Sequence, residues 1–291
     1  MSAMNKALVE ATAGSLGALF GVLALFPLDV AKTKQQAATD KSKKEERAPL
    51  PQLIQRIYEE EGVAGLFSGV GPKAAHTILS NFFYFYWYSW LKGAYERTRG
   101  PLTTSANLAI GALAGAINMS ITLPLDVIST RIQTSKDTTI SALAVVRQMY
   151  AEHGLLSFWK GYVPSLVLVS NPSIFYTIFD RLKLRVAREL SAMEAFVLAA
   201  IAKSIATVVT YPVIRAKVIM QAEASSTKKD DVSMVQVLEQ MWSQDGVAGL
   251  FQGCNAQLLN TVFKSALLLM TKEQIGAIAI RLLYPFQKQV Q

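Results

Sequence analysis

The chain repeats one unit three times, and this repetition constrains its fold more than any other feature. A proline motif occurs as FPLDVAKTKQQ at 26–36, as PLDVISTRIQ from Pro124 and as PVIRAKVIMQ from Pro212. A glycine motif follows each copy, as EGVAGLFSG at 61–69, HGLLSFWKG at 153–161 and DGVAGLFQG at 245–253. Self-similarity at a fixed period indicates a structure built from copies of one unit. We therefore divide the chain into repeats at 1–99, 100–190 and 191–291.

Each repeat contains two apolar windows of membrane-spanning length. Of the 291 residues, 51% are hydrophobic and 17% are charged, a composition more apolar than that of most soluble chains. Windows of the length that spans a bilayer lie at 7–28, 74–91, 106–125, 162–180, 195–214 and 256–280. We predict six transmembrane helices, with a short amphipathic helix inside each repeat. The polar loops 37–51, 135–138 and 223–231 are expected on one side of the membrane, because an even number of helices separates them.

Several classes of protein are disfavoured by what the sequence contains. The two histidines, His76 and His153, lie in different segments, and Cys254 is the only cysteine, so neither a metal site nor a disulfide framework is expected. No phosphate-binding Walker sequence or paired catalytic constellation occurs, which argues against an enzyme. The first segment lacks a basic region and a cleavage site, so we expect no signal peptide. The net charge of +8 fits positive-inside topology, attraction to anionic lipid or an anionic substrate, and nucleic-acid binding is not expected.

Three copies of the pattern Pro-x-acid-x-x-base followed by acid-Gly-x4-aromatic-x-Gly, of which only the first is complete, resemble the mitochondrial carrier family over the whole chain. The resemblance implies an all-α membrane protein in which six tilted transmembrane helices form a pseudo-threefold barrel around a central cavity. It implies one transport domain that works by alternating access, without a cofactor or a metal. Such a protein is a secondary transporter.

The proline motifs predict a gate where the three odd-numbered helices meet. Proline kinks a helix, charges inside a membrane face the interior and pair, and an acid and a base three residues apart share one helix face. In the family the acid of one odd helix meets the base of the next, which leaves Asp126–Lys217 as the one complete pair. Asp29 is then expected opposite Ser129, and Ile214 opposite Lys32. The residues of this proline-motif gate are Pro27, Asp29, Lys32, Pro124, Asp126, Ser129, Pro212 and Lys217.

The family resemblance also implies a second gate at the other ends of the helices, with the motif aromatic-acid-x-x-base. Phe179, Asp180 and Lys183 fit this motif in the second repeat. The first repeat has Tyr88, Ser89 and Lys92 and so lacks the acid, whereas the third has Glu273 but carries Gly276 at the position of the base. Glu273–Lys92 is the one complete pair of this opposite gate. Both gates are therefore expected to be weak, unless other polar contacts compensate for the missing pairs.

Residues that differ between the repeats are candidates for the substrate site, because an asymmetric solute requires an asymmetric site. Lys203 lies nine residues before Pro212, at the position of Ala18 and Gly115 in the other repeats. An ionisable residue inside a membrane is a functional-site hypothesis by default, although a lysine packed near a carbonyl is an alternative. Arg215 stands at the position of two valines and suits bidentate phosphate contact, although an arginine that snorkels to the helix end is an alternative.

Polar residues of the even-numbered helices complete the predicted substrate site. SNPSIFY at 170–176 places Ser170 and Asn171 before a proline in mid-membrane, and His76 lies near the family's contact point. Asn260 and Thr261 occupy the matching region of the last helix, where the orientation of Lys264 stays unassigned. The aromatic run NFFYFYWYSW at 81–90 is read as lipid contact and an interfacial belt, or as providing Tyr84 to stack on a base.

Three longer runs resemble one group within the family, the peroxisomal adenine nucleotide carriers. They are SNPSIFYTIFDRLK, AKSIATVVTYPVIRAKVIMQA and SALLLMTKEQI. The resemblance implies exchange of ATP for AMP or ADP across the peroxisomal membrane, with membrane lipids and peroxisomal import factors as further partners. The alternatives are a carrier of coenzyme A, NAD or FAD, a non-transporting membrane adaptor, and a location in the mitochondrial inner membrane. The basic run KSKKEER at 41–47 is either a targeting element or a solvated loop.

Overall fold

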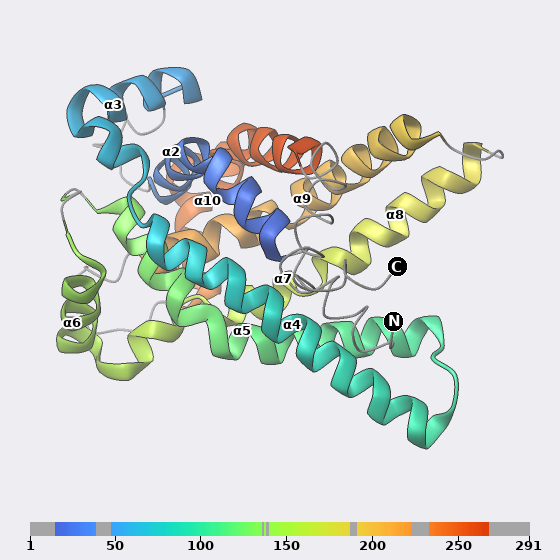
Figure 1. Ribbon diagram of the computed structural model, residues 1–291. Helices are drawn as coiled ribbons and strands as arrows, with labels where there is room; N and C mark the ends of the chain where they lie inside the picture. The colour runs from blue at the N-terminus through green and yellow to red at the C-terminus, as the bar shows by residue number, and fades with distance from the viewer. Residues whose placement is uncertain are drawn as a thin grey trace, which may run out of the picture.

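The computed structural model of the protein describes residues 15–38, 48–135, 137, 140–186, 191–222 and 233–267. Within these ranges every regular element is a helix, as predicted (Figure 1). A first helix, Ser15–Ala24, precedes the labelled elements, and a last helix spans 254–267. Between them lie α2 (Phe26–Ala37), α3 (Leu50–Leu66), α4 (Val70–Arg99), α5 (Thr104–Thr134), α6 (Ala142–His153), η2 (Gly154–Trp159), α7 (Tyr162–Leu168), α8 (Asn171–Val186), α9 (Ala192–Ala222) and α10 (Met234–Leu250).

The helices that carry the proline motifs, α2, α5 and α9, form the centre of the molecule. Each of the three contacts the other two. Figure 1 shows α4 running beside α5 and α8 running beside α9, and both pairs are in contact. The elements therefore follow the predicted order in every repeat, with a proline helix, a short amphipathic helix and a second membrane helix.

Three equivalent hydrophobic cores attach the amphipathic helices to the proline helices. In the first, Val30 of α2 packs with Leu53 and Ile57 of α3. The second joins α5 to α6 and η2, and the third joins α9 to α10. Their buried members are Leu123, Val127, Ile128, Ile132, Val145, Met149 and Phe158 in the second core, and Ala216, Ile219, Val237 and Met241 in the third. Burial of these apolar faces fixes the half of each proline helix that follows its proline.

The ends of the helices agree with the predicted polar loops. The three proline helices end at Ala37, Thr134 and Ala222, next to the predicted loops 37–51, 135–138 and 223–231. Two amphipathic helices begin after serines, because the Ser141 and Ser233 hydroxyls accept hydrogen bonds from the free backbone N–H groups of the first turn. At Ser233 the side chain of Gln236 completes a capping box.

Prolines interrupt two of the predicted spans. The predicted helix 7–28 breaks at Leu25, so that Ser15–Ala24 and α2 meet at 73°, with Pro27 in the first turn of α2. The predicted span 162–180 is likewise divided into α7 and α8, and Pro172 is the second residue of α8. Proline lacks an N–H and is tolerated in the first turn of a helix but not in its interior, which accounts for both breaks. Pro124 and Pro212, in contrast, lie inside the continuous helices α5 and α9.

Several described helices are long and apolar enough to cross a membrane. They are Thr104–Thr134, the stretch Gly154–Val186 formed by η2, α7 and α8, and Met193–Ala222, and the bent pair of Ser15–Ala24 with α2 is a fourth if it is taken as one span. Helix α4 has the necessary length, 30 residues, but its tyrosines, tryptophans and polar side chains lower its mean hydropathy. The sixth predicted span, 256–280, is described only as far as residue 267.

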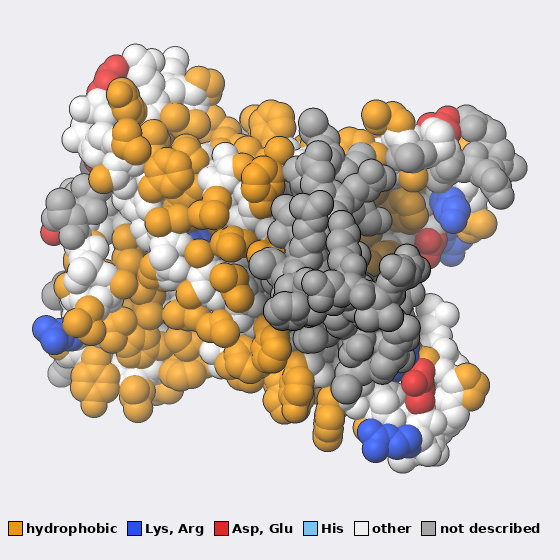
Figure 2. Space-filling model, viewed as in Figure 1, with side chains coloured by type: hydrophobic (Ala, Val, Ile, Leu, Met, Phe, Trp, Pro, Cys, Tyr) orange, Lys and Arg blue, Asp and Glu red, His pale blue; other side chains and the backbone are white. Residues whose placement is uncertain are grey.

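The surface has the apolar character of a protein that faces lipid. Figure 2 shows hydrophobic side chains across the face of the molecule, whereas most charged side chains in this view lie at its edges. Exposed members include Phe82, Tyr86 and Trp90 on α4, Leu113 and Ile121 on α5, and Ile201 and Val209 on α9. Apolar side chains that face outward on membrane-length helices are stable in a bilayer and costly in water.

Candidate functional site

The last glycine of each glycine motif places its helix against a neighbouring proline helix. Gly69, Gly161 and Gly253 all have φ between 76° and 79°, a left-handed conformation that favours glycine. A Cβ atom at Gly69 would lie 3.0 Å from the backbone oxygen of Ser129 on α5, and one at Gly253 would lie 3.2 Å from the side chain of Gln36 on α2. Gly161 approaches α9 in the same way. The three close approaches link each repeat to the next and the third to the first.

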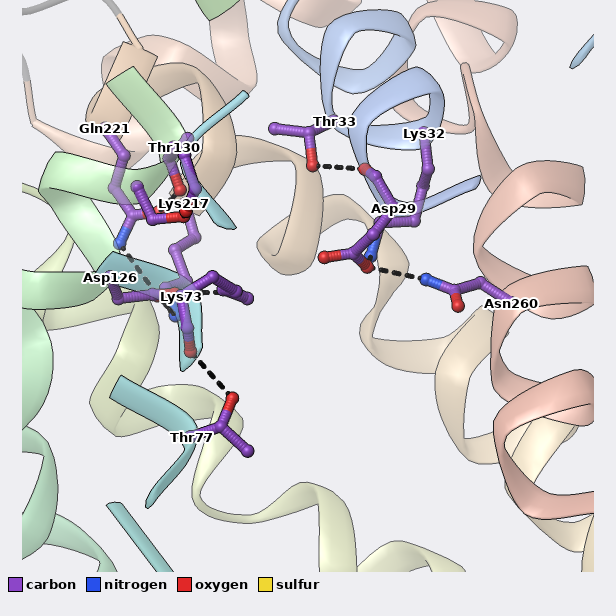
Figure 3. Close-up of polar contacts among 12 residues, drawn as sticks. Asp29, Lys32, Thr33, Lys73, Thr77, Asp126, Thr130, Lys217, Gln221 and Asn260 are labelled. Carbon is purple, nitrogen blue, oxygen red and sulfur yellow. Dashed lines mark hydrogen bonds and ion pairs between the residues drawn. The ribbon is translucent and has the colours of Figure 1, made fainter. Parts of the chain in front are cut away.

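Asp126 lies at the centre of the contact between α5 and α9 (Figure 3). Its Oδ2 is 2.8 Å from Nζ of Lys217 on α9, so the pair that the family resemblance implied is formed. Its Oδ1 accepts a hydrogen bond from Nζ of Lys73 on α4 at 2.9 Å, and Gln221 donates to Oδ2 at 3.2 Å. The expectation that one ion pair forms this part of the gate is therefore wrong, because three helices share the carboxylate.

Asp29 forms a second buried cluster, and its partners differ from the predicted one. Its Oδ1 lies 2.8 Å from Nζ of Lys32 on α2 and 3.1 Å from Nζ of Lys264 on the last helix. Asn260 also donates to Oδ1, at 2.7 Å, as Figure 3 shows. The predicted partner Ser129 instead donates its hydroxyl to the backbone oxygen of Gly69. A buried carboxylate without a cation is costly, and Lys264 supplies a second charge that the family pattern does not include.

The proline-motif gate has the additional polar contacts that were the alternative to a weak gate. Four lysines surround two buried carboxylates, and both carboxylates join different helices. Lys32 is not left opposite Ile214 without a charge partner, because it pairs with Asp29 in its own helix. Each of the two carboxylates at this end of the described helices therefore has two lysine partners.

Arg215 follows Ile214 and occupies the junction between α9 and the end of α2. Its side chain is buried, and Nε donates to the backbone oxygen of Gln36 at 3.2 Å. Nη2 donates to the backbone oxygen of Ala38 at 2.8 Å and to Oε1 of Gln252 at 3.0 Å, and Nη1 donates to the backbone oxygen of Gly249. The guanidinium is thus directed at protein acceptors, contrary to the prediction that it contacts a substrate phosphate.

Buried glutamines form a part of the site that the sequence reasoning missed. Gln36, Gln133 and Gln221 each lie nine residues after the proline of their repeat, a coincidence visible in the sequence. Gln36 donates to the hydroxyl of Tyr211 on α9 at 3.3 Å. Gln221 accepts from the hydroxyl of Thr130 on α5 at 3.1 Å and donates to the Asp126 carboxylate. Uncharged side chains thus reinforce the contacts between the proline helices.

Lys203 and Asn171, both predicted at the substrate site, lie together between α8 and α9. Nζ of Lys203 donates to Oδ1 of Asn171 at 3.1 Å and lies 5.7 Å from the centre of the Phe175 ring. The Asn171 amide donates to the hydroxyl of Thr210 at 2.8 Å. Neither described contact of Lys203 is with a carboxylate. The ammonium therefore keeps its charge available to an anion in a partly buried position.

The other predicted polar residues do not converge on Lys203. The hydroxyls of Ser170 and Thr261 donate to backbone oxygens of their own helices, at 2.7 Å and 2.8 Å. Asn260 belongs to the Asp29 cluster. Nε2 of His76 is buried and finds no hydrogen-bond partner in the described part of the chain. His76 and Asn260 therefore lie on helices that contribute to the two carboxylate clusters.

Tyr84 lies in a row of aromatic side chains along α4. Its ring stacks on that of Tyr88, with centroids 6.2 Å apart, and its hydroxyl lies 3.5 Å from the place where a Cβ would stand at Gly111 on α5. Other rings of the run, including Phe82 and Tyr86, are exposed. The arrangement accommodates both readings of the run, with lipid-facing rings and one partly buried tyrosine next to α5.

The residues of the predicted opposite gate are exposed where they are described. Lys92 lies 3.9 Å from Glu96 of its own helix, and the side chains of Ser89, Asp180 and Lys183 are exposed. Glu273, the predicted partner of Lys92, lies outside the described residues. A cleft of about 490 Å³ follows the second half of α8, lined by residues that include Thr177, Arg181 and Arg185, and contains none of the predicted substrate residues.

Comparison with known proteins gives matches along almost the whole chain. The family model described as "Mitochondrial carrier protein" matches residues 4–99, 100–190 and 188–281. The chain is 40% identical over 293 residues to "Peroxisomal adenine nucleotide carrier 1" of Glycine max, covering 94% of this chain and 91% of that protein. It is 37% identical over 292 residues to the protein of the same name from Arabidopsis thaliana, covering 92% and 89%. It is 29% identical over 317 residues to "Peroxisomal nicotinamide adenine dinucleotide carrier" of Arabidopsis thaliana, covering 94% and 96%.

Proposed function

This chain belongs to the mitochondrial carrier family, and from that premise we propose that it is an antiporter that exchanges adenine nucleotides, ATP against AMP or ADP, across the peroxisomal membrane. The observation that carries the proposal is its similarity, over more than nine tenths of its length, to two plant proteins named as peroxisomal adenine nucleotide carriers. In this proposal the protein is a secondary transporter and not an enzyme, and it uses no cofactor.

The cluster around Lys203 supports a nucleotide as the substrate. The ammonium contacts an amide oxygen and approaches an aromatic ring, and neither partner neutralises its charge. A phosphate oxygen can replace the Asn171 oxygen as its acceptor, and the resulting charge-assisted hydrogen bond is stronger than the one it replaces. Tyr84 is available to stack on a base, which is worth about 1–3 kcal/mol in other nucleotide sites.

The two predicted gates support alternating access. The proline-motif gate has its carboxylates buried and paired, whereas the described residues of the opposite gate are exposed. In the proposed cycle this arrangement corresponds to a carrier closed at the proline motifs and accessible from the other side. Breaking the Asp126–Lys217 contact, with formation of the Glu273–Lys92 pair at the opposite gate, then exposes the substrate to the second side.

Transport by the purified protein tests the proposal. The protein is reconstituted into liposomes loaded with AMP, and uptake of labelled ATP is measured with ADP, NAD, FAD and coenzyme A as competitors. We expect ADP and AMP to compete with ATP, and the other three compounds to compete weakly. Uptake that stays at the level of protein-free liposomes with every internal substrate would favour a non-transporting membrane adaptor.

NAD is the second candidate substrate, favoured by the relative named as a peroxisomal nicotinamide adenine dinucleotide carrier. NAD also contains adenine and phosphate, so Lys203 and Tyr84 suit it as well. NAD lacks the terminal phosphate of AMP, and its two phosphates are both bridged. Efficient exchange of NAD in the same liposomes, without exchange of ATP, would replace the first proposal with the second.

A further inference from the structure

Each buried carboxylate of the proline-motif gate binds lysines of two kinds. One lysine belongs to a proline helix, and the other belongs to the second membrane helix of a repeat. The proline-helix lysines are Lys32, which pairs with Asp29, and Lys217, which pairs with Asp126, both at 2.8 Å. The second-helix lysines are Lys264, which pairs with Asp29 at 3.1 Å, and Lys73, which pairs with Asp126 at 2.9 Å. The same division of partners thus occurs at two places in the structure.

The two kinds of lysine differ in accessibility. The side chains of the second-helix lysines are 23% exposed at Lys73 and 32% exposed at Lys264. Those of the proline-helix lysines are 14% exposed at Lys217 and 13% at Lys32. The second-helix lysines are therefore the more accessible cations of each cluster, and a ligand can approach them more easily.

The cluster also carries more positive than negative charge. Four lysines meet two carboxylates, so the six groups have an excess of two positive charges. Such an excess in a poorly solvated region attracts an anion. The helices that carry the second-helix lysines also bear His76, three residues after Lys73, and Asn260, four residues before Lys264, both with a buried polar atom that lacks a described hydrogen-bond partner.

We propose that Lys73 and Lys264 form a phosphate-binding subsite that couples substrate binding to opening of the proline-motif gate. Without substrate the two lysines hold the carboxylates of Asp126 and Asp29. With substrate they turn to the phosphate groups, and each carboxylate keeps only its proline-helix lysine. This inference rests on the proposed transport of a nucleotide, and it names the residues through which the substrate weakens one gate.

The chemistry of lysine suits this exchange. Its ammonium is a point charge on a flexible stem with three rotatable donors, so it can change acceptors without a shift of the backbone. After the exchange, Asp29 still pairs with Lys32, and Asp126 still pairs with Lys217. No carboxylate is left without a cation, and the excess charge is neutralised by the substrate. The weakened contacts between helices are then easier to break.

Apparent substrate constants of the variants Lys73→Gln and Lys264→Gln test the inference. Because ATP carries more negative charge than AMP, loss of a lysine should weaken the binding of ATP more than the binding of AMP. We expect the apparent KM for ATP to rise about tenfold, equivalent to about 1.4 kcal/mol, and that for AMP to rise clearly less. Lys73→Arg and Lys264→Arg keep the charge and should keep the ratio of the two constants near that of the unmodified protein. This ratio does not depend on how much folded protein each preparation contains.

Labelling of Cys254 gives a second readout that does not depend on transport. This single cysteine follows Gly253, which packs against Gln36 and Tyr211 at the gate. With its partner lysine removed, the gate should open more often without nucleotide. We expect Lys73→Gln to increase the rate at which a maleimide labels Cys254 in the absence of ATP. Arg147→Gln, on the exposed face of α6, removes one positive charge elsewhere and should change neither the labelling rate nor the ratio of constants.

The outcomes separate this inference from the proposed function. If the unmodified protein exchanges no adenine nucleotide, the proposed function is wrong, and the phosphate-binding subsite is wrong as well. If the unmodified protein exchanges ATP and AMP, and both glutamine variants keep its ratio of constants, the transport proposal stands and the phosphate-binding subsite is wrong. An equal increase of both constants, with unchanged Cys254 labelling, would likewise assign the two lysines a purely structural role.

Discussion

Arg215 of α9 donates a hydrogen bond from Nε to the backbone oxygen of Gln36 on α2, across 3.2 Å. The two residues belong to the third and the first repeat, so the contact closes the ring of proline helices. The third repeat has Ile214 where the others have Asp29 and Asp126, and it offers no carboxylate there. The junction between α5 and α9 contains the Asp126–Lys217 ion pair, whereas the junction between α2 and α9 contains an arginine that binds backbone oxygens.

Replacement of Arg215 should lower stability more than it changes substrate binding. Arg215→Met removes the donors from buried backbone oxygens, which should lower the free energy of unfolding by about 2–4 kcal/mol. Arg215→Lys should lower it less, since an ammonium satisfies some of these acceptors. Thermal unfolding of the purified protein in detergent measures the change. An unchanged melting temperature together with a raised KM for ATP would instead indicate that Arg215 belongs to the substrate site.

Substitution of Asp126 should impair exchange and leave cations unpaired. Asp126→Asn places the ammonium groups of Lys73 and Lys217 near an uncharged amide, and we expect a loss of exchange of tenfold or more, since a buried charge without its partner costs about 3–5 kcal/mol. Swapping the charges, with Asp126→Lys and Lys217→Asp, should restore part of the exchange. Adding Lys73→Gln should raise the melting temperature of the swapped protein, because it removes a contact between like charges.

The charge-swap series has a clear negative outcome. If the double variant is expressed at normal levels and exchanges no more ATP than Asp126→Asn does, the two side chains do not act as a pair during transport. If Lys73→Gln lowers the melting temperature of the swapped protein, the assignment of Lys73 to Asp126 is wrong.

Lys203 is expected to contact a phosphate group of the substrate. Loss of a charge-assisted hydrogen bond costs about 1.5–3 kcal/mol, so Lys203→Ala should raise the apparent KM for ATP at least tenfold. Lys203→Arg should retain part of the affinity, because its charge is preserved. Exchange assays with ATP and AMP measure both constants. The control variants Lys228→Ala and Lys229→Ala, in the predicted polar loop, should behave like the unmodified protein. A Lys203→Ala protein with unchanged affinity and rate would assign Lys203 to helix packing.

The close approach of Gly253 to α2 and α9 predicts that substitution of this glycine lowers the stability of the protein. Alanine there would have to adopt φ 79°, which costs about 1–2 kcal/mol, with its Cβ 3.1 Å from the Tyr211 hydroxyl and 3.2 Å from Gln36. We expect Gly253→Ala to lower the melting temperature. Gly93→Ala is the matched control, since Gly93 lies inside helix α4 and its Cβ would meet only the flexible end of Arg97, at 3.7 Å. Equal melting temperatures for the two variants would contradict the packing described for the glycine motif.

Features that repeat along the chain were predictable from the sequence. The order of helices in each repeat, the ends at Ala37, Thr134 and Ala222, and the approach of Asp126 to Lys217 all follow from motifs that occur more than once. Each of these features has a local cause, such as a polar loop, an apolar period or a fixed spacing. The break before Pro172 has a local cause as well, but a continuous apolar window concealed it.

Features that occur in one repeat only were not predictable, because they depend on which helices meet. Lys264 was visible as an ionisable residue in a predicted membrane helix, but its partner Asp29 lies 235 positions earlier in the chain. Lys73 lies just before the predicted window 74–91, so the apolar pattern does not mark it as a residue of the membrane interior. Arg215 was noted for its charge, yet the acceptors that bind it are backbone oxygens, which no side-chain pattern reveals.

The most direct test of the account is counter-exchange by the reconstituted protein. Uptake of labelled ATP is measured into liposomes that contain AMP and into liposomes that contain no nucleotide. An antiporter of adenine nucleotides takes up ATP rapidly in the first case and at a much lower rate in the second, and external AMP then releases the accumulated label. Equal uptake in the two cases would contradict antiport, and uptake no greater than that of protein-free liposomes would contradict adenine nucleotide transport altogether.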